Sequence, residues 1–146
     1  MAYAVRALHQ DDAAVAQALV ARFHSAGVST EYLSALLSRS ANLLLVAEHQ
    51  GSVIGFLFAH FIDRLRLATP QLFIYELEVA AEHRRKGVAL ALMSSALKVA
   101  AARSIDAFVF TNHSNAAAIA LYRKLGGVAK NGDDLLFVFH MSGHVG

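Results

Sequence analysis

Near the N-terminus, apolar residues recur at helical spacing in two separate segments. Residues 13–24 carry apolar side chains at every fourth position, and the Asp11-Asp12 pair before them is of a residue type that caps helices. Residues 31–39 show a similar apolar side, with Thr30 as the expected cap. The spacing therefore predicts two helices, one over Ala13–His24 and one over Glu31–Arg39.

Shorter apolar runs, bounded by polar turns, predict strands along the rest of the chain. The predicted strands are Tyr3–Leu8, Leu43–Glu48, Val53–Ile62, Leu72–Val79, Ile105–Phe110 and Leu135–Met141. Two further helices are predicted over Gly87–Arg103 and Ser114–Leu125. Because strands and helices interleave only in the second half, we expect an α/β (α+β) fold. It would be one domain over residues 1–146, with a mixed, mainly antiparallel sheet of about six to seven strands and about four helices.

The composition narrows the classes of function. The chain has 146 residues, of which 56% are hydrophobic and 16% charged, which fits one globular domain and excludes a disordered chain. It has no cysteine, so disulfide scaffolds, thiolate zinc sites and cysteine nucleophiles are excluded. Its 13 basic and 11 acidic residues give a net charge of +2, which is too small to make nucleic acid an expected partner.

Neither the N-terminus nor the apolar runs predict an association with membranes. Residues 1–6 lack the basic and apolar regions of a signal peptide. The longest apolar runs, residues 53–62 and 88–102, are shorter than the roughly 20 residues that a transmembrane helix needs. We therefore expect no membrane partner and a cytoplasmic location.

The segment from residue 75 to residue 93 combines a strand, a basic turn and a helix. The first turn of a helix offers unpaired backbone N–H groups and the positive end of the helix dipole. Here the small residues Gly87 and Ala89, with Val88 between them, leave that backbone accessible, and the run Arg84-Arg85-Lys86 adds positive charge. The pattern predicts a phosphate-binding turn suited to a pyrophosphate, or alternatively a solvated basic turn before a core helix.

Two motifs give the chain a family resemblance. Arg84-x-x-Gly87-x-Ala89, following an acidic strand, resembles the acetyl-coenzyme A motif of the GNAT N-acetyltransferases. The stretch from Asn115 to Gly126 resembles that family's Asn-x-x-Ala-x-x-Leu-Tyr-x-Lys-Leu-Gly segment. The resemblance implies a GNAT-like domain that uses acetyl-coenzyme A as its cosubstrate. The residues that it assigns to the cofactor are Leu77, Glu78, Val79, Arg84, Arg85, Lys86, Gly87, Val88, Ala89, Asn115 and Tyr122.

The implied chemistry, direct acyl transfer to an amine, needs a base for the amine proton. Glu76 and Glu78 stand two apart on a predicted strand, so their side chains share one face and attract a cation. Glu76 is the first candidate for the base or substrate anchor and Glu78 the second; alternatively, both face solvent on an edge strand. The resemblance implies that the Val79 N–H donates to the oxyanion. It also implies that Tyr122 reprotonates the thiolate, although Tyr122 equally fits an apolar helix stripe.

Within the family, the chain is most similar to the small aminoglycoside 3-N-acetyltransferases. The similar stretches are residues 31–37, 73–79, 82–89 and 120–126. The implied function is transfer of an acetyl group to the 3-amino group of an aminoglycoside antibiotic, which confers resistance. A polycationic sugar needs several carboxylates, and the candidates are Glu76, Glu78, Asp133 and Asp134. The Asp133-Asp134 pair fits a hairpin turn equally well.

Other interpretations stay open. Residues 112–115 hold no acid where those relatives carry one, which leaves another small amine or a protein N-terminus as the acceptor. A non-catalytic acetyl-coenzyme A-binding module is a further alternative, which Glu76 and Tyr122 disfavour. No metal is expected, because Gly143 separates His140 from His144 after a strand. The resemblance adds a homodimer as an oligomeric state to be tested.

Overall fold

The structure, a computed structural model, describes residues 2–130, 132 and 135–141. The chain divides into two compact units, Met1–Asn112 and His113–Gly146, and each is described by itself. The predicted substrate residues Asp133 and Asp134 and the histidine His144 lie outside the described residues.

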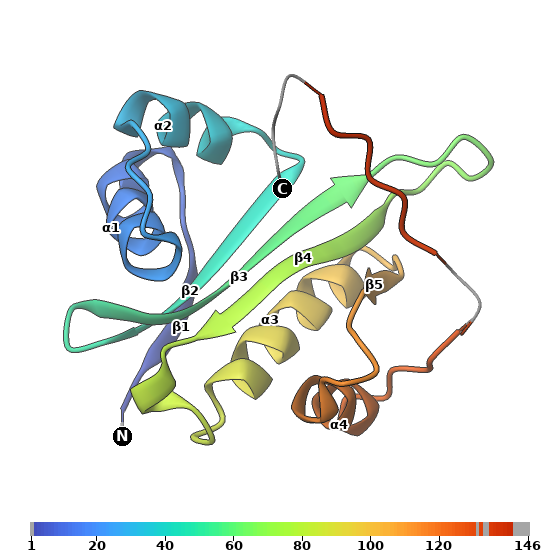
Figure 1. Cartoon of the computed structure of the whole chain (residues 1–146). Coiled ribbons are helices and arrows are strands. Elements are labelled where there is room, and N and C mark those ends of the chain that lie inside the picture. The colour runs from blue at the N-terminus through green and yellow to red at the C-terminus, as the bar shows by residue number, and fades with distance from the viewer. Residues whose placement is uncertain (1, 131, 133–134, 142–146) are drawn as a thin grey trace. The chain divides into compact units, whose positions relative to one another are not determined.

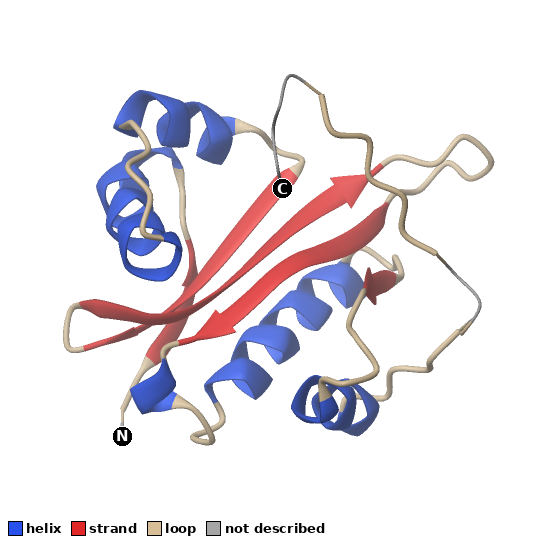
Figure 2. Ribbon diagram, in the orientation of Figure 1, coloured by secondary structure: helices blue, strands red, loops and turns tan. Residues whose placement is uncertain are grey.

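The first unit is built on one sheet with the strand order β1-β2-β3-β4-β5 (Figures 1 and 2). The strands are β1 (Ala4–Ala7), β2 (Asn42–His49), β3 (Ser52–Ile62), β4 (Gln71–Val79) and β5 (Ala107–Val109). The first four pair antiparallel, and β4 pairs with β5 parallel. The prediction of a mixed, mainly antiparallel sheet is therefore confirmed, with five strands among the described residues rather than six or seven.

Three α-helices and two short 3-10 helices complete the first unit. They are η1 (Gln10–Asp12), α1 (Ala13–His24), α2 (Thr30–Ser38), η2 (Ala81–His83) and α3 (Val88–Ala102). The predicted helices are all present, but the cap of α2 is not Thr30. The hydroxyl of Ser29 accepts the N–H of Tyr32 at 3.1 Å, because Ser29 is extended while Thr30 already has helical backbone.

The two faces of the sheet pack against different helices. On one face, Phe56 of β3 belongs to a buried cluster with Leu19 of α1 and Leu33 of α2. On the other face, a Cβ added to Gly55 would lie 3.1 Å from Val88 and 3.3 Å from Leu92, both on α3. Neighbouring residues of a strand point to opposite faces, so α1 and α2 cover one face and α3 covers the other.

The pairing of β4 is irregular on both sides. Towards β3, Glu76 pairs with Phe58 and Ile74 pairs with Ala59, so Tyr75 is an extra residue in a β-bulge. Towards β5, the ladder runs only from Leu72 to Ile74. The bulge puts Glu76 and Glu78 on the same face as Phe56 and Phe58, and within the described residues of the first unit no strand pairs with the second half of β4 on the β5 side.

The second unit contains α4 (Ala116–Lys124). Asn115 caps this helix, because its side-chain oxygen accepts the N–H of Ala118 at 3.0 Å. The prediction of a strand over Leu135–Met141 is wrong, since residues 135–141 have no strand structure. Their large apolar side chains, such as Phe137 and Phe139, are exposed. An apolar run alone does not form a strand, because a strand also needs a neighbour for its backbone hydrogen bonds.

Candidate active site

The turn between β4 and α3 exposes the start of a helix. Gly87 is the N-cap of α3 with a φ of 80°, and Arg85 also has a positive φ of 60°. The hydroxyl of Tyr3 donates to the carbonyl of Gly87 at 3.1 Å, which ties the turn to the start of the chain. Backbone N–H groups in such alternating conformations, followed by a helix N-terminus, form a concave surface for an anion. The contribution of Tyr3 was not predicted from the sequence.

Three basic side chains surround this turn, as predicted. Arg84, Arg85 and Lys86 are all exposed. The Nε atom of Arg84 donates to the carbonyl oxygen of Val79 at 3.1 Å, so Arg84 holds the turn against the end of β4. Arg85 and Lys86 add positive charge to the same turn, and an exposed charge of this kind attracts phosphate in a salt-dependent way.

The open side of β4 presents backbone donors. Ala80 donates to the carbonyl of Ile54 at 2.8 Å, and in an antiparallel ladder this direction alternates from residue to residue. The N–H groups of Leu77 and Val79 therefore point away from β3. The carbonyl oxygen of Val79 agrees with this orientation, because it accepts a hydrogen bond from Arg84 instead of from a residue of β3. With β5 ending at Val109, these groups lie on the side of β4 that β5 does not pair beyond Ile74, where the cofactor is expected from the sequence.

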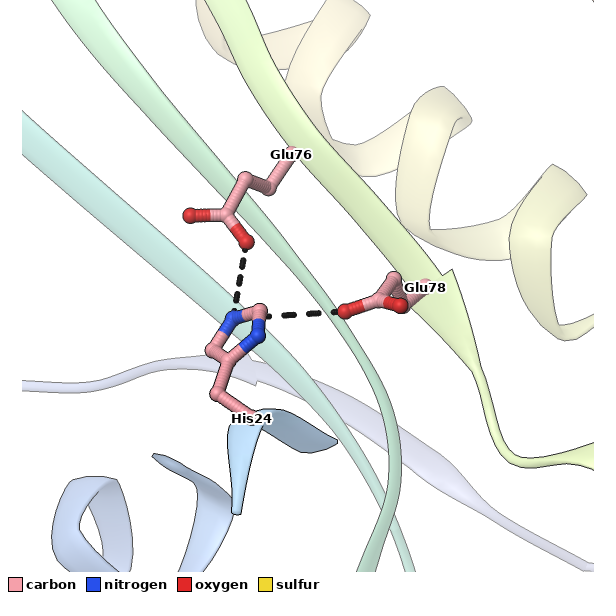
Figure 3. A group of neighbouring side chains, drawn as sticks. All are labelled: His24, Glu76 and Glu78. Atoms are coloured by element: carbon pink, nitrogen blue, oxygen red, sulfur yellow. Dashed lines mark ion pairs between the residues drawn. The ribbon is translucent and has the colours of Figure 1, made fainter. Parts of the chain in front are cut away.

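The two predicted carboxylates lie together with a histidine that sequence analysis missed (Figure 3). The Nε2 atom of His24 lies 2.9 Å from Oε2 of Glu76 and 4.0 Å from Oε2 of Glu78. The side chains are 40% exposed for His24, 30% for Glu76 and 45% for Glu78, so a ligand can reach all three from solvent. β4 lies between β3 and β5, but its pairing with β5 covers only Leu72–Ile74, so Glu76 and Glu78 stand on the part of the strand that β5 does not pair.

The end of α1 sets the position of His24. His24 is the last residue of α1, and Ser25 after it takes the left-handed conformation that ends the helix. Its ring packs edge-on against the ring of Phe56, with the centroids 5.9 Å apart. Two residues earlier, Arg22 donates to the carbonyl of Val53 and pairs with Glu82, which fastens the helix end to β3 and to η2.

A second histidine lies on the same face of the sheet. His60 of β3 contacts the side-chain oxygen of Asn42 through Nδ1 at 2.9 Å and packs against Phe58. Burial lowers the pKa of His60, and the negative charge of Glu76 acts in the opposite direction. His60 is therefore neutral at physiological pH and adds no positive charge to the carboxylate pair.

Two predicted site residues belong to the second unit. Asn115 caps α4, and Tyr122 lies on the same helix. Burial raises the pKa of the Tyr122 phenol, which keeps its proton in place at neutral pH. Their roles towards a cofactor remain predictions, as does the role of Asp133 and Asp134.

Among the described residues, one histidine–carboxylate group has metal-ligating atoms within 4.8 Å of one another, and it is the group of His24, Glu76 and Glu78. Within the described part of the chain, no helix has the length and apolar character needed to cross a bilayer.

Comparison with curated proteins finds N-acetyltransferases that are similar in sequence to this chain. Over 91 residues the chain is 32% identical to human N-acetyltransferase 8, a match that covers 62% of this chain and 40% of the relative. The chain thus spans about two-fifths of the length of the curated relatives that it matches.

Two solved structures illustrate the range of proteins with this fold. An aminoglycoside acetyltransferase from an uncultured soil metagenomic sample aligns with a TM-score of 0.87 and 29% identity, covering 97% of this chain and 100% of that one. A ribosomal-protein-alanine N-acetyltransferase from Brucella melitensis aligns with a TM-score of 0.74 and 22% identity, covering 94% of this chain and 100% of that one.

The family assignment combines this likeness with the geometry. The basic turn before α3, the open side of β4 and the paired carboxylates all lie within residues 7–127, which match the acetyltransferase (GNAT) family. The chain belongs to that family.

Proposed function

We propose that the protein transfers an acetyl group from acetyl-coenzyme A directly to a primary amine, with an aminoglycoside as the acceptor. The observation that carries this proposal is the continuity of β4, the basic turn and α3. Backbone donors on the open side of β4 end at Val79, and Arg84 joins Val79 to the turn before Gly87. One segment thus offers sites for an extended amide-containing arm and for a phosphate group.

The donor groups present fit acetyl-coenzyme A. Its pyrophosphate matches the N–H groups at the start of α3 and the charges of Arg84, Arg85 and Lys86. Its pantetheine arm matches the outward backbone groups of Leu77 and Val79, as an added strand would. The thioester supplies an activated acetyl group, so the chain needs no covalent nucleophile, in agreement with its lack of cysteine.

Glu76 and Glu78 would bind the acceptor. An amine arrives as an ammonium ion, and the two carboxylates attract it to the face covered by α1. The amine must lose a proton before it attacks, and Glu76 is the base or acts through a water molecule. The N–H of Val79 would stabilise the negative oxygen of the tetrahedral intermediate.

Tyr122 would return a proton to the leaving thiolate. The pKa of Tyr122 is raised by burial, so the phenol is protonated at neutral pH and can donate. The experiment is to replace Tyr122 with Phe. Turnover should fall more than the affinity for coenzyme A, whereas an equal loss in both would contradict the acid role.

The choice of an aminoglycoside is supported by the soil-sample acetyltransferase, which is 29% identical over 97% of this chain. Glu76 and Glu78, together with the predicted contributions of Asp133 and Asp134, would provide the negative charge that a polycation needs. The 3-amino group is the predicted position of transfer. A different small amine or a protein N-terminus is the second candidate, because residues 112–115 carry no acid.

The test is an assay of thiol release with saturating acetyl-coenzyme A and a panel of acceptors. Release with gentamicin but not with peptide amines supports the aminoglycoside, and the acetylated position is then identified by NMR. Release only with peptides or simple amines supports the second candidate. Binding of coenzyme A without turnover on any amine would make the protein a binding module.

We also propose a cytoplasmic location and a homodimer. Fractionation of the producing cells tests the location, and sedimentation of the purified protein tests the assembly.

A further inference from the structure

We propose that His24 is a positioning residue of the acceptor site, which holds Glu76 in the orientation that binds and deprotonates the amine. This inference rests on the proposed function. His24 stands apart from both sequence motifs, and its place in the site comes from the geometry alone.

The contacts of His24 are those of an orienting group. Its Nε2 atom lies 2.9 Å from one oxygen of Glu76, and the two side chains form an ion pair when the ring is protonated. One carboxylate oxygen is thus engaged by the protein, which leaves the other to accept from the substrate. The distance of 4.0 Å to Glu78 puts the same ring between the two acids.

The position between the acids also has an electrostatic consequence. Two carboxylates that face each other repel, and each would turn towards solvent without a donor between them. A protonated ring in that place reduces the repulsion, with Nε2 at 2.9 Å from Glu76 and 4.0 Å from Glu78. His24 thus holds the site open for an ammonium ion before the substrate arrives.

The ring itself is held in place from two sides. Phe56, which is 2% exposed, packs edge-on against it. The bonds of Arg22 to Val53 and Glu82 fix the last turn of α1 on the sheet. Because both anchors belong to the first unit, the position of His24 follows from the packing of that unit alone.

A metal centre is not favoured for these three residues. All three side chains are at least 30% exposed, so the site lacks the closed shape of a structural metal site. The contact between His24 and Glu76 already involves atoms that a metal would need.

The experiment compares three replacements of His24. His24→Gln places an amide N–H near the position of Nε2, His24→Asn places one near Nδ1, and His24→Ala removes the donor. We expect His24→Ala and His24→Asn to lower kcat/KM for the amine by about tenfold to a hundredfold, since misplacement of a reacting group has effects of this size. His24→Gln should remain within a few-fold of the unchanged protein.

Coenzyme A affinity and the melting temperature are measured in parallel, and neither should change in the Gln variant. Equal activity of the Ala variant and the unchanged protein would overturn the inference. Equal loss in the Gln and Ala variants would also overturn it, because a positioning donor can be replaced by an amide. Activity that needs Zn²⁺ and disappears with a chelator would overturn it in favour of a metal centre. An unchanged protein that acetylates no amine contradicts the proposed function instead, so the two failures are distinguishable.

Discussion

The Nε atom of Arg84 and the carbonyl oxygen of Val79 are joined by a hydrogen bond of 3.1 Å. This bond connects the first basic residue of the turn to the residue whose N–H is proposed to face the reacting carbonyl. Arg84 therefore holds the end of β4, and its proposed second task is to attract phosphate. Arg85, which is exposed on the same turn, would have only the task of attracting phosphate.

Replacing Arg84 with Ala should reduce both coenzyme A affinity and kcat. Hydrogen bonds to charged groups contribute about 1.5–3 kcal/mol, and at this exposed site we expect the lower end, about tenfold in affinity. Arg85→Ala is the matched control, and it should weaken binding without changing kcat at saturation. Calorimetry at two salt concentrations and steady-state kinetics measure both effects. A loss of kcat in Arg85→Ala equal to that in Arg84→Ala would contradict the role of Arg84 in holding the end of β4.

Replacing Glu76 with Gln should leave coenzyme A binding intact and lower turnover by about 10²–10⁴-fold, which is the range for a general base. The shape of the side chain is kept while its ability to accept a proton is lost. Glu78→Gln is the comparison, and a smaller effect on kcat than on KM is expected there. If Glu76→Gln turns over normally, Glu76 is not the base.

Gly55 lies where β3 and β4 meet α3, and it has no room for a side chain. An added Cβ would lie 3.0 Å from the carbonyl oxygen of Glu78 and 3.1 Å from Val88. Gly55→Ala should therefore lower the free energy of unfolding by about 1–3 kcal/mol, as overpacking usually does. Gly27→Ala is the control, because nothing lies within 4 Å of its added Cβ. Urea unfolding compares the two variants, and equal stability would mean that α3 can shift without cost.

Gly87 combines open space with a left-handed backbone. Its φ is 80°, and the added Cβ would meet only the hydroxyl of Tyr3, at 3.8 Å. Gly87→Ala should cost about 1–2 kcal/mol through its backbone conformation and weaken coenzyme A binding. Gly87→Asn should cost less, since Asn adopts this conformation more readily than Ala. Thermal unfolding with and without coenzyme A ranks the stability of the two variants. If Gly87→Asn is the less stable of the two, steric contact and not φ determines the loss of stability.

Asp12 should make stability depend on acid pH. The N–H of His9 and the guanidinium of Arg6 hold the pKa of Asp12 below its usual range. A lowered pKa in the folded state stabilises the protein above the unfolded pKa of about 3.9, and this stabilisation is lost as the pH falls through the folded value.

The measurement is urea unfolding of the unchanged protein and the Asp12→Asn variant between pH 7 and pH 2. The stability difference should be constant above about pH 5 and shrink below about pH 4. A difference that grows in acid would contradict the assignment.

Much of the first unit was predictable because its elements are short and strongly patterned. The bounds of α1 are those predicted, and the predicted strands from Leu43 to Val79 differ from β2, β3 and β4 by one residue at their ends. Hydrophobic spacing fixes such elements locally. The motif from Arg84 to Ala89 also indicated the turn before α3. The acids on β4 were predictable with it, because they lie close to this motif in the chain.

What the sequence did not reveal depends on contacts between distant segments. His24 is a lone histidine at the end of a helix, and only the packing of α1 on β3 brings it to Glu76. The bulge at Tyr75 left a signal in the sequence, since the apolar residues that alternate with the acids after it are Leu77 and Val79, which differ in parity from Leu72 and Ile74. The strand predicted over Leu135–Met141 failed for the opposite reason. The apolar pattern of a strand is present there, but residues 135–141 do not form one.

The extra residue at Tyr75 also determines where this chain tolerates changes in length. The polar loop over residues 63–70 can gain or lose residues without turning any side chain of β4. One residue inserted between Tyr75 and Val79 would instead rotate the rest of the strand by half a turn, burying charge under α3 and offering aliphatic groups to the amine. Homologues should therefore vary freely in the loop and keep an invariant number of residues from the bulge to Gly87.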